Sequence, residues 1–319
     1  MPILSIDLGG TKLAAAVFTE NGELITEETI ALEKRQGSAV GALITEQVEK
    51  YEVLQKRNSQ TITSVGISVP GIYHKTTGTV WAPNIPGWEN YPLLEEIKSV
   101  AANMPVSTDS DRACYIMGEC WKGTARNCSD AIYLAVGTGI GAGILADGKV
   151  LRGHNEIAGA VGWMALKHPY IKEYKKCGCF ETMASGEGIT KLAKTILLQK
   201  NDYNGKLKAI DNLTTADIFN AYEEGDMVAK EVFDHCIELW GMAIANLVSI
   251  FNSQKIILGG GVFGPAIKFI PAIREEAFKW AQPVSMQQVV IEASALGRHA
   301  GLYGAAFIAL QSHKTNTDL

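Results

Sequence analysis

Short apolar runs separated by glycine turns dominate the start of the chain. They predict strands at residues 3–8, 13–18 and 24–30. Gly9-Gly10-Thr11-Lys12 forms the first predicted turn, and Asn21-Gly22 is a strong hairpin signal between the second and third strands. The opening of the chain therefore predicts a strand, a glycine-rich turn and a hairpin.

Residues 131–151 repeat this order. Strands are predicted at 132–136 and 140–145, with Gly137-Thr138-Gly139 between them and Asp147-Gly148 as the hairpin pair before a third strand. Two matching units in one chain predict an internal duplication that gives two similar lobes.

The remaining pattern alternates helices and strands. Apolar residues at helical spacing predict a helix from Ala39, and Asp226 is placed to cap a long amphipathic helix. Residues 71–92 are rich in turns and aromatic residues, which predicts a loop or irregular hairpin near a site. Further predictions are strands at 65–69, 105–107 and 255–258, helices at 111–121 and 301–310, and a disordered tail at 312–319.

Composition places the chain among ordinary globular proteins. It has 319 residues, of which 47% are hydrophobic and 20% charged, and its formal net charge is -5. An acidic chain does not favour nucleic acid or an anionic membrane as its main partner. No signal peptide or membrane segment is evident, and six cysteines in a chain of this length are typical of reduced thiols. We therefore expect a cytoplasmic protein without a membrane or nucleic-acid partner.

The first motif with candidate chemistry is Asp7-Leu-Gly-Gly-Thr-Lys12. Glycines after a strand let backbone N–H groups approach phosphate oxygens, and Thr11 and Lys12 add donors. Asp7 at the strand end is a candidate magnesium ligand, either directly or through water. The alternative is a glycine hairpin with a carboxylate at its edge.

The second motif, Gly137-Thr138-Gly139, lies in a run that lacks the Walker lysine and leads into a strand, so it fits neither a Walker loop nor a dinucleotide fold. With the first turn it is suited to hold a polyphosphate from two sides. The third motif, Gly259-Gly260-Gly261, suits close backbone approach to a flat ligand such as adenosine, although a structural turn explains it almost equally well.

The fourth motif is Thr108-Asp109-Ser110-Asp111, at the start of a predicted helix. One interpretation is an aspartate that caps the helix. The functional interpretation makes Asp111 the general base that takes a proton from a substrate hydroxyl during phosphoryl transfer.

Taken together, these motifs resemble the ROK family of bacterial sugar kinases, typified by glucokinases, over essentially the whole chain. The resemblance rests on their order together with Val69-Pro-Gly71, Pro83-Asn-Ile-Pro-Gly-Trp88 and Gly301-Leu-Tyr-Gly-Ala-Ala306. It implies an α/β, two-lobed, RNase H-like (actin-like ATPase) fold with a central cleft. The expected domains are 1–115 plus 300–319 as the smaller lobe and 116–299 as the larger.

The resemblance also implies the roles of individual residues. Asp111 would be the catalytic base. A small-molecule sugar would be the partner, ATP and Mg²⁺ the cofactors, and a homodimer or larger homo-oligomer the assembly. The ATP and phosphate site would comprise Asp7, Gly9, Gly10, Thr11, Lys12, Gly137, Thr138, Gly139, Gly259, Gly260 and Gly261. The substrate site would comprise Asn84, Ser110, Asp111, Trp163 and Glu181.

The chain departs from the family pattern where the sugar would be recognised. Ser110 stands where the family has an asparagine, and Ala160 and Trp163 stand where it has a glutamate and a histidine. A tryptophan can stack on a sugar but offers one donor and no acceptor. The phosphoryl-transfer motifs are intact, so the sequence predicts a kinase more firmly than a glucokinase.

The family's zinc site is also altered. Trp163 replaces its histidine, and Cys179 alone aligns with a cysteine of its loop, with Cys177 two residues before it; the two earlier cysteine positions fall on Lys172 and Tyr174. Even with His168 the two cysteines give three ligands, which do not close a tetrahedral structural site, so we expect no zinc.

Three functions therefore compete at this point. The leading one is ATP-dependent phosphorylation of a hexose or related carbohydrate, with an N-acetylhexosamine as an alternative substrate. The second is a nucleotide- and sugar-binding sensor or pseudokinase of the same fold. The third, a transcriptional repressor, is disfavoured by the acidic charge and by the short stretch before Asp7.

Overall fold

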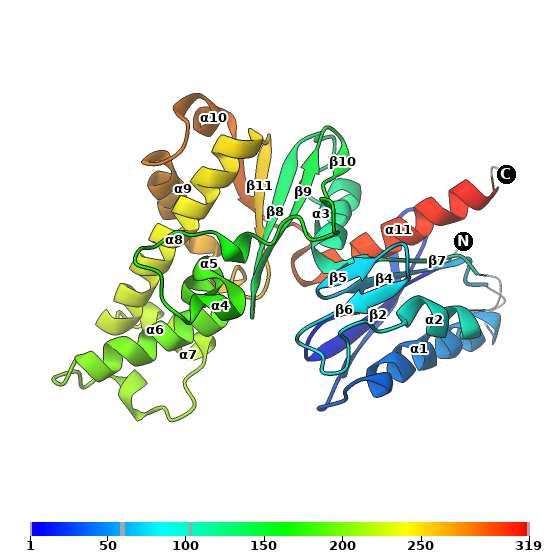
Figure 1. Ribbon diagram of the computed structural model, residues 1–319, viewed down its shortest axis with the longest axis horizontal. Coiled ribbons are helices and arrows are strands. Elements are labelled where there is room, and N and C mark those ends of the chain that lie inside the picture. Colours follow the sequence, from blue (N-terminus) through cyan, green and yellow to red (C-terminus); the bar gives the residue numbers. More distant parts are fainter. Residues whose placement is uncertain (1, 58–60, 102–103, 318–319) are drawn as a thin grey trace. The chain divides into compact units, whose positions relative to one another are not determined.

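The computed structural model describes residues 2–57, 61–101 and 104–317. It divides into two compact units, and each is considered by itself (Figure 1). The first unit comprises Met1–Asn127, Val150–Ala158 and Arg298–Leu319, and the second comprises Cys128–Lys149 and Gly159–Gly297. The predicted domain boundaries, after residues 115 and 299, remain predictions. The compact units divide after residues 127, 149, 158 and 297.

The first unit is built on a sheet with strand order β3-β2-β1-β4-β7. β1 pairs antiparallel with β2 and parallel with β4, so the hairpin occupies one side of the sheet and the parallel strands the other. The strands are β1 (Ile3–Leu8), β2 (Lys12–Phe18), β3 (Leu24–Ala31), β4 (Ser64–Val69) and β7 (Val106–Ser110). The helices are α1 (Ser38–Arg57), α2 (Leu93–Val100), α3 (Asp111–Lys122) and α11 (Ala300–Thr317).

The second unit repeats this design, with strand order β10-β9-β8-β11-β12. Its first pair is again antiparallel, and β11 pairs parallel with both β8 and β12. The strands are β8 (Ala131–Val136), β9 (Ile140–Ala146), β10 (Lys149–Val150), β11 (Lys255–Gly259) and β12 (Val290–Ala293). The equivalent strand orders confirm the predicted duplication.

Helices of the second unit are more numerous than those of the first in the described part of the chain. They are α4 (Tyr174–Cys177), α5 (Cys179–Ala184), α6 (Gly186–Gln199), α7 (Thr215–Glu223), α8 (Met227–Phe251), α9 (Ile270–Phe278) and α10 (Pro283–Gln288), with short 3-10 turns at Val161–Trp163, Lys206–Ala209, Pro265–Phe269 and Gly297–His299. The predicted cap is confirmed, because the Asp226 side chain accepts from Val228 N at 2.8 Å and Ala229 N at 3.0 Å.

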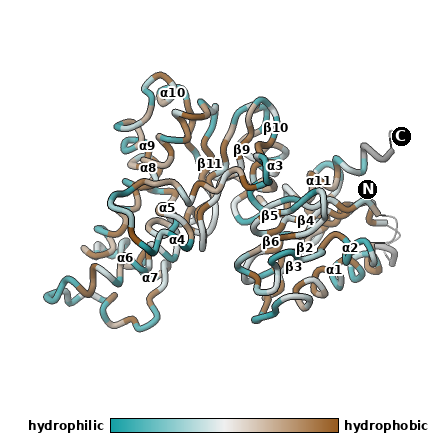
Figure 2. Tube along the Cα trace, viewed as in Figure 1, coloured by the Kyte–Doolittle hydropathy of each residue, from teal (hydrophilic) through white to brown (hydrophobic). Residues whose placement is uncertain are grey.

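Each unit has its own hydrophobic core. In the second unit α8 lines the core with large side chains such as Phe233 and Trp240, both fully buried. Figure 2 shows the apolar stretch of β11, where Ile256 to Leu258 are fully buried. Within the described residues, no helix is both long and apolar enough to cross a membrane.

The hairpin expected as one alternative for residues 71–92 is confirmed, because β5 (Ile72–His74) and β6 (Thr79–Trp81) pair antiparallel there. Two other predictions made from the pattern require correction. The strand expected at 105–107 extends to Ser110, so Asp109 lies in β7. The tail was expected to be disordered from residue 312, but α11 continues to Thr317. Extending a helix that has already formed costs much less free energy than starting one. The last two residues lie outside the described part of the chain.

Helix α11 packs unusually close to its neighbours in the first unit, and glycines permit this. A methyl group on Gly304 would overlap the Cys114 carbonyl of α3, and one on Gly66 of β4 would overlap the Ala305 carbonyl of α11. The buried Ser5 hydroxyl donates to Leu302 O at 2.6 Å. Backbone therefore meets backbone, with no side chain between the elements.

We predict that Gly304→Ala lowers the free energy of unfolding by about 1–3 kcal/mol, because the new methyl group must displace α3. Helix propensity alone would give the opposite sign, a gain of about 1 kcal/mol for alanine over glycine. Urea unfolding of this variant and of the exposed-site control Gln311→Ala on the same helix measures the difference. A stabilised Gly304→Ala protein would contradict the close packing.

Candidate functional site

The first glycine turn connects β1 to β2 and leaves its backbone exposed. Gly9 N donates to Lys12 O at 2.9 Å, which closes the turn. A methyl group on Gly10 would lie 2.7 Å from Asn84 Nδ2, so Gly10 provides room for that amide. The structure therefore brings the predicted phosphate turn and one predicted sugar ligand, Asn84, into contact.

Asp7 lies one position before the end of β1, next to Ser68 of β4. The pKa of the Asp7 carboxyl is raised to about 6, mainly by burial and to a lesser extent by the nearby charge of Asp111, while the Ser68 hydroxyl and Lys12 partly offset this rise. A methyl group on Gly301 of α11 would overlap the carboxylate. A carboxylate held this way is suited to a divalent cation, which would neutralise the charge that its surroundings disfavour.

Asp111 is the first residue of α3, and Ser110 is the N-cap. The Ser110 hydroxyl accepts from Ala113 N at 3.4 Å, so the alternative in which an aspartate caps this helix is wrong. Asp111 Oδ1 accepts from Arg112 N at 2.8 Å. Burial raises the pKa of Asp111, and the adjacent Arg112 partly lowers it, so this carboxylate is a stronger base than an exposed one.

Asp109 forms an ion pair that the sequence did not suggest. Arg152 donates to Asp109 Oδ2 from Nη2 at 2.5 Å and from Nε at 3.2 Å. Ser110 N donates to the other carboxylate oxygen at 2.9 Å, and Lys75 Nζ lies 3.8 Å from Oδ2. Asp109 is 5% exposed and both of its carboxylate oxygens accept hydrogen bonds, whereas the only hydrogen bond described for the Asp111 carboxylate is the one from Arg112 N.

The second glycine turn, in the second unit, is held from two sides. Gly137 N donates to Gly139 O at 2.9 Å within the turn, and Gly186 N at the start of α6 donates to Gly137 O at 2.8 Å. Glu181 Oε2 of α5 accepts from Ile140 N at 2.6 Å. Glu181, predicted as a sugar ligand, therefore contacts the backbone at the end of the turn.

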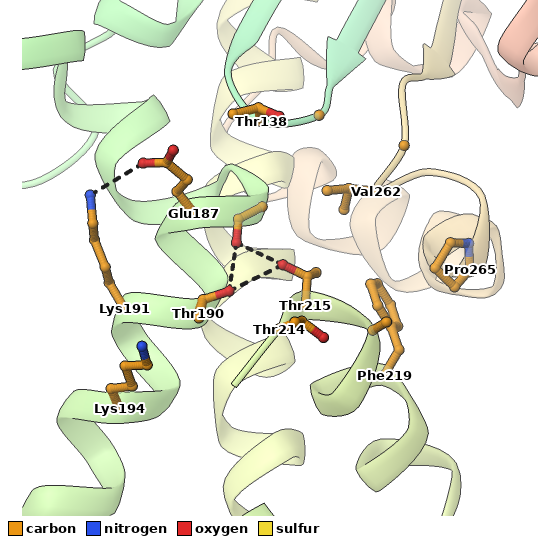
Figure 3. A pocket seen from close by; sticks show the side chains of 14 residues that line it. Thr138, Glu187, Thr190, Lys191, Lys194, Thr214, Thr215, Phe219, Val262 and Pro265 are labelled. Carbon is orange, nitrogen blue, oxygen red and sulfur yellow. Dashed lines mark hydrogen bonds and ion pairs between the residues drawn. The ribbon is translucent and has the colours of Figure 1, made fainter. Parts of the chain in front are cut away.

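A pocket of about 710 Å³ in the second unit joins this turn to the third glycine motif (Figure 3). Residues Gly137 and Thr138 lie in its lining together with Gly261. The other lining residues are Gly186, Glu187, Thr190, Lys191, Lys194, Thr214, Thr215, Ala216, Phe219, Val262 and Pro265. Its volume and its combination of one apolar wall with a few polar groups are typical of a small-ligand site.

The polar wall of this pocket comes from α6 and the start of α7. The hydroxyls of Thr190 and Thr215 lie 3.2 Å apart, and both donate to Gly186 O. Figure 3 shows these contacts opposite Val262 and Phe219, with Lys191 paired to Glu187 at 3.6 Å. None of these α6 residues was among the predicted site residues. The spacing of residues 187, 190, 191 and 194, which places them on one helix face, could have indicated them.

Trp163 is the last residue of a 3-10 turn and is 56% exposed, so its ring is available to a ligand. The residues left from the zinc motif serve other contacts. Cys177 Sγ lies 3.3 Å from Thr182 Oγ1, and Cys179 is buried. Among the described residues no group of three or more His, Cys, Asp or Glu side chains is placed to hold a metal ion, so the donor set for structural zinc is not assembled.

The chain belongs to the ROK family, because the sequence model of that family matches residues 3–312. It is 31% identical to a glucokinase of Halalkalibacterium halodurans, in an alignment that covers 98% of this chain and 96% of that protein. It is also 31% identical to a xylose repressor of Caldicellulosiruptor bescii, covering 95% of this chain and 76% of the repressor. The family thus includes both kinases and regulators among the relatives of this chain.

The structure resembles a ROK family glucokinase from Streptomyces griseus that was crystallised in complex with glucose and AMPPNP. The TM-score is 0.80 at 27% identity, and the match covers 98% of this chain and 100% of that one. This likeness confirms the predicted α/β, actin-like ATPase fold.

The raised pKa of Asp7 predicts a pH-dependent cost in stability. The folded state holds the Asp7 proton up to about pH 6 and the unfolded state only to 3.8, so stability falls as the pH rises between these values. Asp7→Asn should therefore exceed wild type by about 1–3 kcal/mol in unfolding free energy at pH 7, with the difference vanishing near pH 4. Thermal unfolding from pH 4 to 7 measures this.

Asp147→Asn, at an exposed hairpin position, is the matched control and should show no such trend. An Asp7→Asn effect that stays constant across this pH range would contradict the prediction.

Proposed function

We propose that this protein is an ATP-dependent sugar kinase that phosphorylates a hydroxyl of a hexose or related carbohydrate. The observation that carries the proposal is the environment of Asp111. Its carboxylate stands at the N-terminus of α3 with a raised pKa, near a second carboxylate, Asp109, that forms an ion pair with Arg152. This arrangement suits a general base. The relationship to glucokinases along nearly the whole chain supports it.

ATP is the proposed phosphoryl donor. The pocket of the second unit would receive the nucleoside, with Phe219 and Val262 offering an apolar wall and Gly261 permitting close approach. The backbone N–H groups of the turns at 9–12 and 137–139 would hold phosphate oxygens, since neither turn has bulky side chains at its glycines. The AMPPNP in the Streptomyces griseus glucokinase complex supports this choice of donor.

Magnesium would be held at Asp7. The carboxylate lies at a strand end next to an exposed turn, and its raised pKa reflects a charge without sufficient compensation. When bound, the ion would neutralise part of the negative charge on the ATP phosphates.

The protein's own groups then have separate tasks. Asp111 would take the proton of the attacking sugar hydroxyl, and Arg112 beside it would stabilise the ionised form. Asp109, fixed by Arg152 and Ser110 N, would hold the start of α3 in place. The Gly10–Asn84 contact would link the position of a sugar ligand to that of the phosphate turn.

The substrate is proposed only as a class. Ser110 uses its hydroxyl to cap α3, and Ala160 and Trp163 supply no acceptor, so this chain has few fixed acceptors for sugar hydroxyls. Trp163 would stack on a sugar face. Coupled ADP-release assays with glucose, mannose, fructose, allose, N-acetylglucosamine and N-acetylmannosamine test the class. Sugar-dependent ADP release supports a kinase.

A sensor that binds nucleotide and sugar without transfer is the second candidate. The xylose repressor relative and the substitutions at Ser110, Ala160 and Trp163 favour it. Nucleotide binding without turnover on any sugar of the panel would support this function over the kinase.

We predict that Asp111→Asn lowers the turnover number by about 10²–10⁴-fold, the usual contribution of a general base, because the amide cannot accept the proton. The dissociation constant for AMPPNP should change little, since no pocket residue is altered. Steady-state kinetics and calorimetry measure the two quantities.

The control Asp202→Asn changes an exposed aspartate beyond α6 and should match wild type in both assays. Turnover of Asp111→Asn close to that of wild type would refute the assignment of the base.

A further inference from the structure

The side chain of Glu181 occupies a space that two glycines leave open. A methyl group on Gly139 would lie 2.8 Å from Glu181 Oε2, and one on Gly162 would lie 3.1 Å from the same atom. Oε2 accepts from Ile140 N at 2.6 Å, and Ile140 directly follows the turn at 137–139. Such short contacts to a charged acceptor are stronger than neutral hydrogen bonds.

Helix α5 gives Glu181 a rigid base. The fully buried Trp240 of α8 donates from Nε1 to Ala184 O at the end of α5, at 3.1 Å. Gly186, two residues further on, donates to Gly137 O at the other end of the turn. One segment, residues 181–186, therefore holds both ends of the turn at 137–139.

The Glu181 carboxylate has two oxygens; Oε2 accepts from Ile140 N, and the Cys177 thiol also hydrogen-bonds to the carboxylate. An ionised carboxylate offers about four acceptor positions, so Oε1 retains lone pairs for another donor. The side chain is only partly buried, which leaves it accessible to a ligand. Burial raises the pKa of Glu181, whereas Ile140 N–H and the Cys177 thiol favour its charged form.

We propose that Glu181 is a positioning residue that couples sugar binding to nucleotide binding. Oε2 fixes the backbone of the phosphate turn through Ile140 N, and Oε1 accepts a hydroxyl of the sugar. This inference rests on the proposed kinase function. A sugar that orders the carboxylate also orders the turn, so sugar and nucleotide each tighten the binding of the other by the same factor.

A residue that only contacted the sugar would behave differently. Its removal would weaken sugar binding and leave nucleotide binding unchanged in the absence of sugar. A residue that positions the turn must affect nucleotide affinity without any sugar present, and this difference can be measured without turnover.

Two variants separate the two oxygens. Glu181→Gln keeps an oxygen for Ile140 N but replaces the second acceptor by an amide that only donates, whereas Glu181→Ala removes both. Without sugar, calorimetry should show AMPPNP binding about tenfold weaker for Glu181→Ala, the size expected for one lost hydrogen bond to a charged group. Binding by Glu181→Gln should stay within about threefold of wild type.

With sugar present, the panel sugar that wild type phosphorylates fastest should tighten AMPPNP binding to wild type but not to Glu181→Gln. In kinetics, Glu181→Gln should then raise KM for both substrates more than it lowers kcat. Glu173→Gln and Glu173→Ala, at an exposed position before α4, are the matched controls and should follow wild type. Thermal unfolding of all four variants verifies that they are folded.

Wild-type AMPPNP affinity of Glu181→Ala without sugar would overturn the positioning role. A sugar effect on AMPPNP binding that persists in Glu181→Gln would overturn the coupling. Failure of the proposed function is seen separately, as absence of sugar-dependent ADP release by the wild-type protein.

Discussion

The close contact between α11 and the first sheet is the constraint on which the candidate catalytic groups depend. Because Gly66 and Gly304 have no side chains, the helix backbone reaches β4 and α3 directly. The start of the same helix packs on the Asp7 carboxylate, where Gly301 provides the space. Burial in these surroundings raises the pKa of Asp7 and, at the start of α3, that of Asp111. Packing of the last helix thus contributes to the burial that raises the pKa of Asp7.

The two glycine turns occupy equivalent positions in the duplicated sheets, but their surroundings differ. The turn at 9–12 is exposed and contacts Asn84, whereas the turn at 137–139 is held by Glu181 and Gly186 from behind. Residues of the second turn line the pocket of about 710 Å³, and no residue of the turn at 9–12 is among its described lining residues. The buried carboxylates Asp7 and Asp111 thus lie in the first unit, and the supported turn with its pocket lies in the second. This division agrees with a reaction in which positioning and charge neutralisation do most of the work.

Local patterns predicted much of this structure because they depend on neighbouring residues. The strands around both glycine turns and the Asp226 cap follow from periodicity and turn chemistry. The pair Asp109–Arg152 could not be predicted, because the two residues are far apart in the sequence and no pattern links them. The Ser110 cap was equally ambiguous, since Ser110 and Asp111 are both good capping residues. The pocket wall on α6 required knowledge of which helix face is turned toward β8 and β11.

The positions at which this chain departs from the ROK pattern differ in what the structure requires of them. Ser110 preserves the start of α3 by capping it, so loss of a sugar ligand there costs no helix stability. Glu181 is retained, and its contact with Ile140 N gives a reason apart from sugar recognition, because a nonpolar residue would leave that N–H without its partner. In the proposed kinase, residues that contact only the sugar would be free to change with the substrate. Residues that also support the phosphate turn or a helix end are constrained by the structure whatever the sugar is.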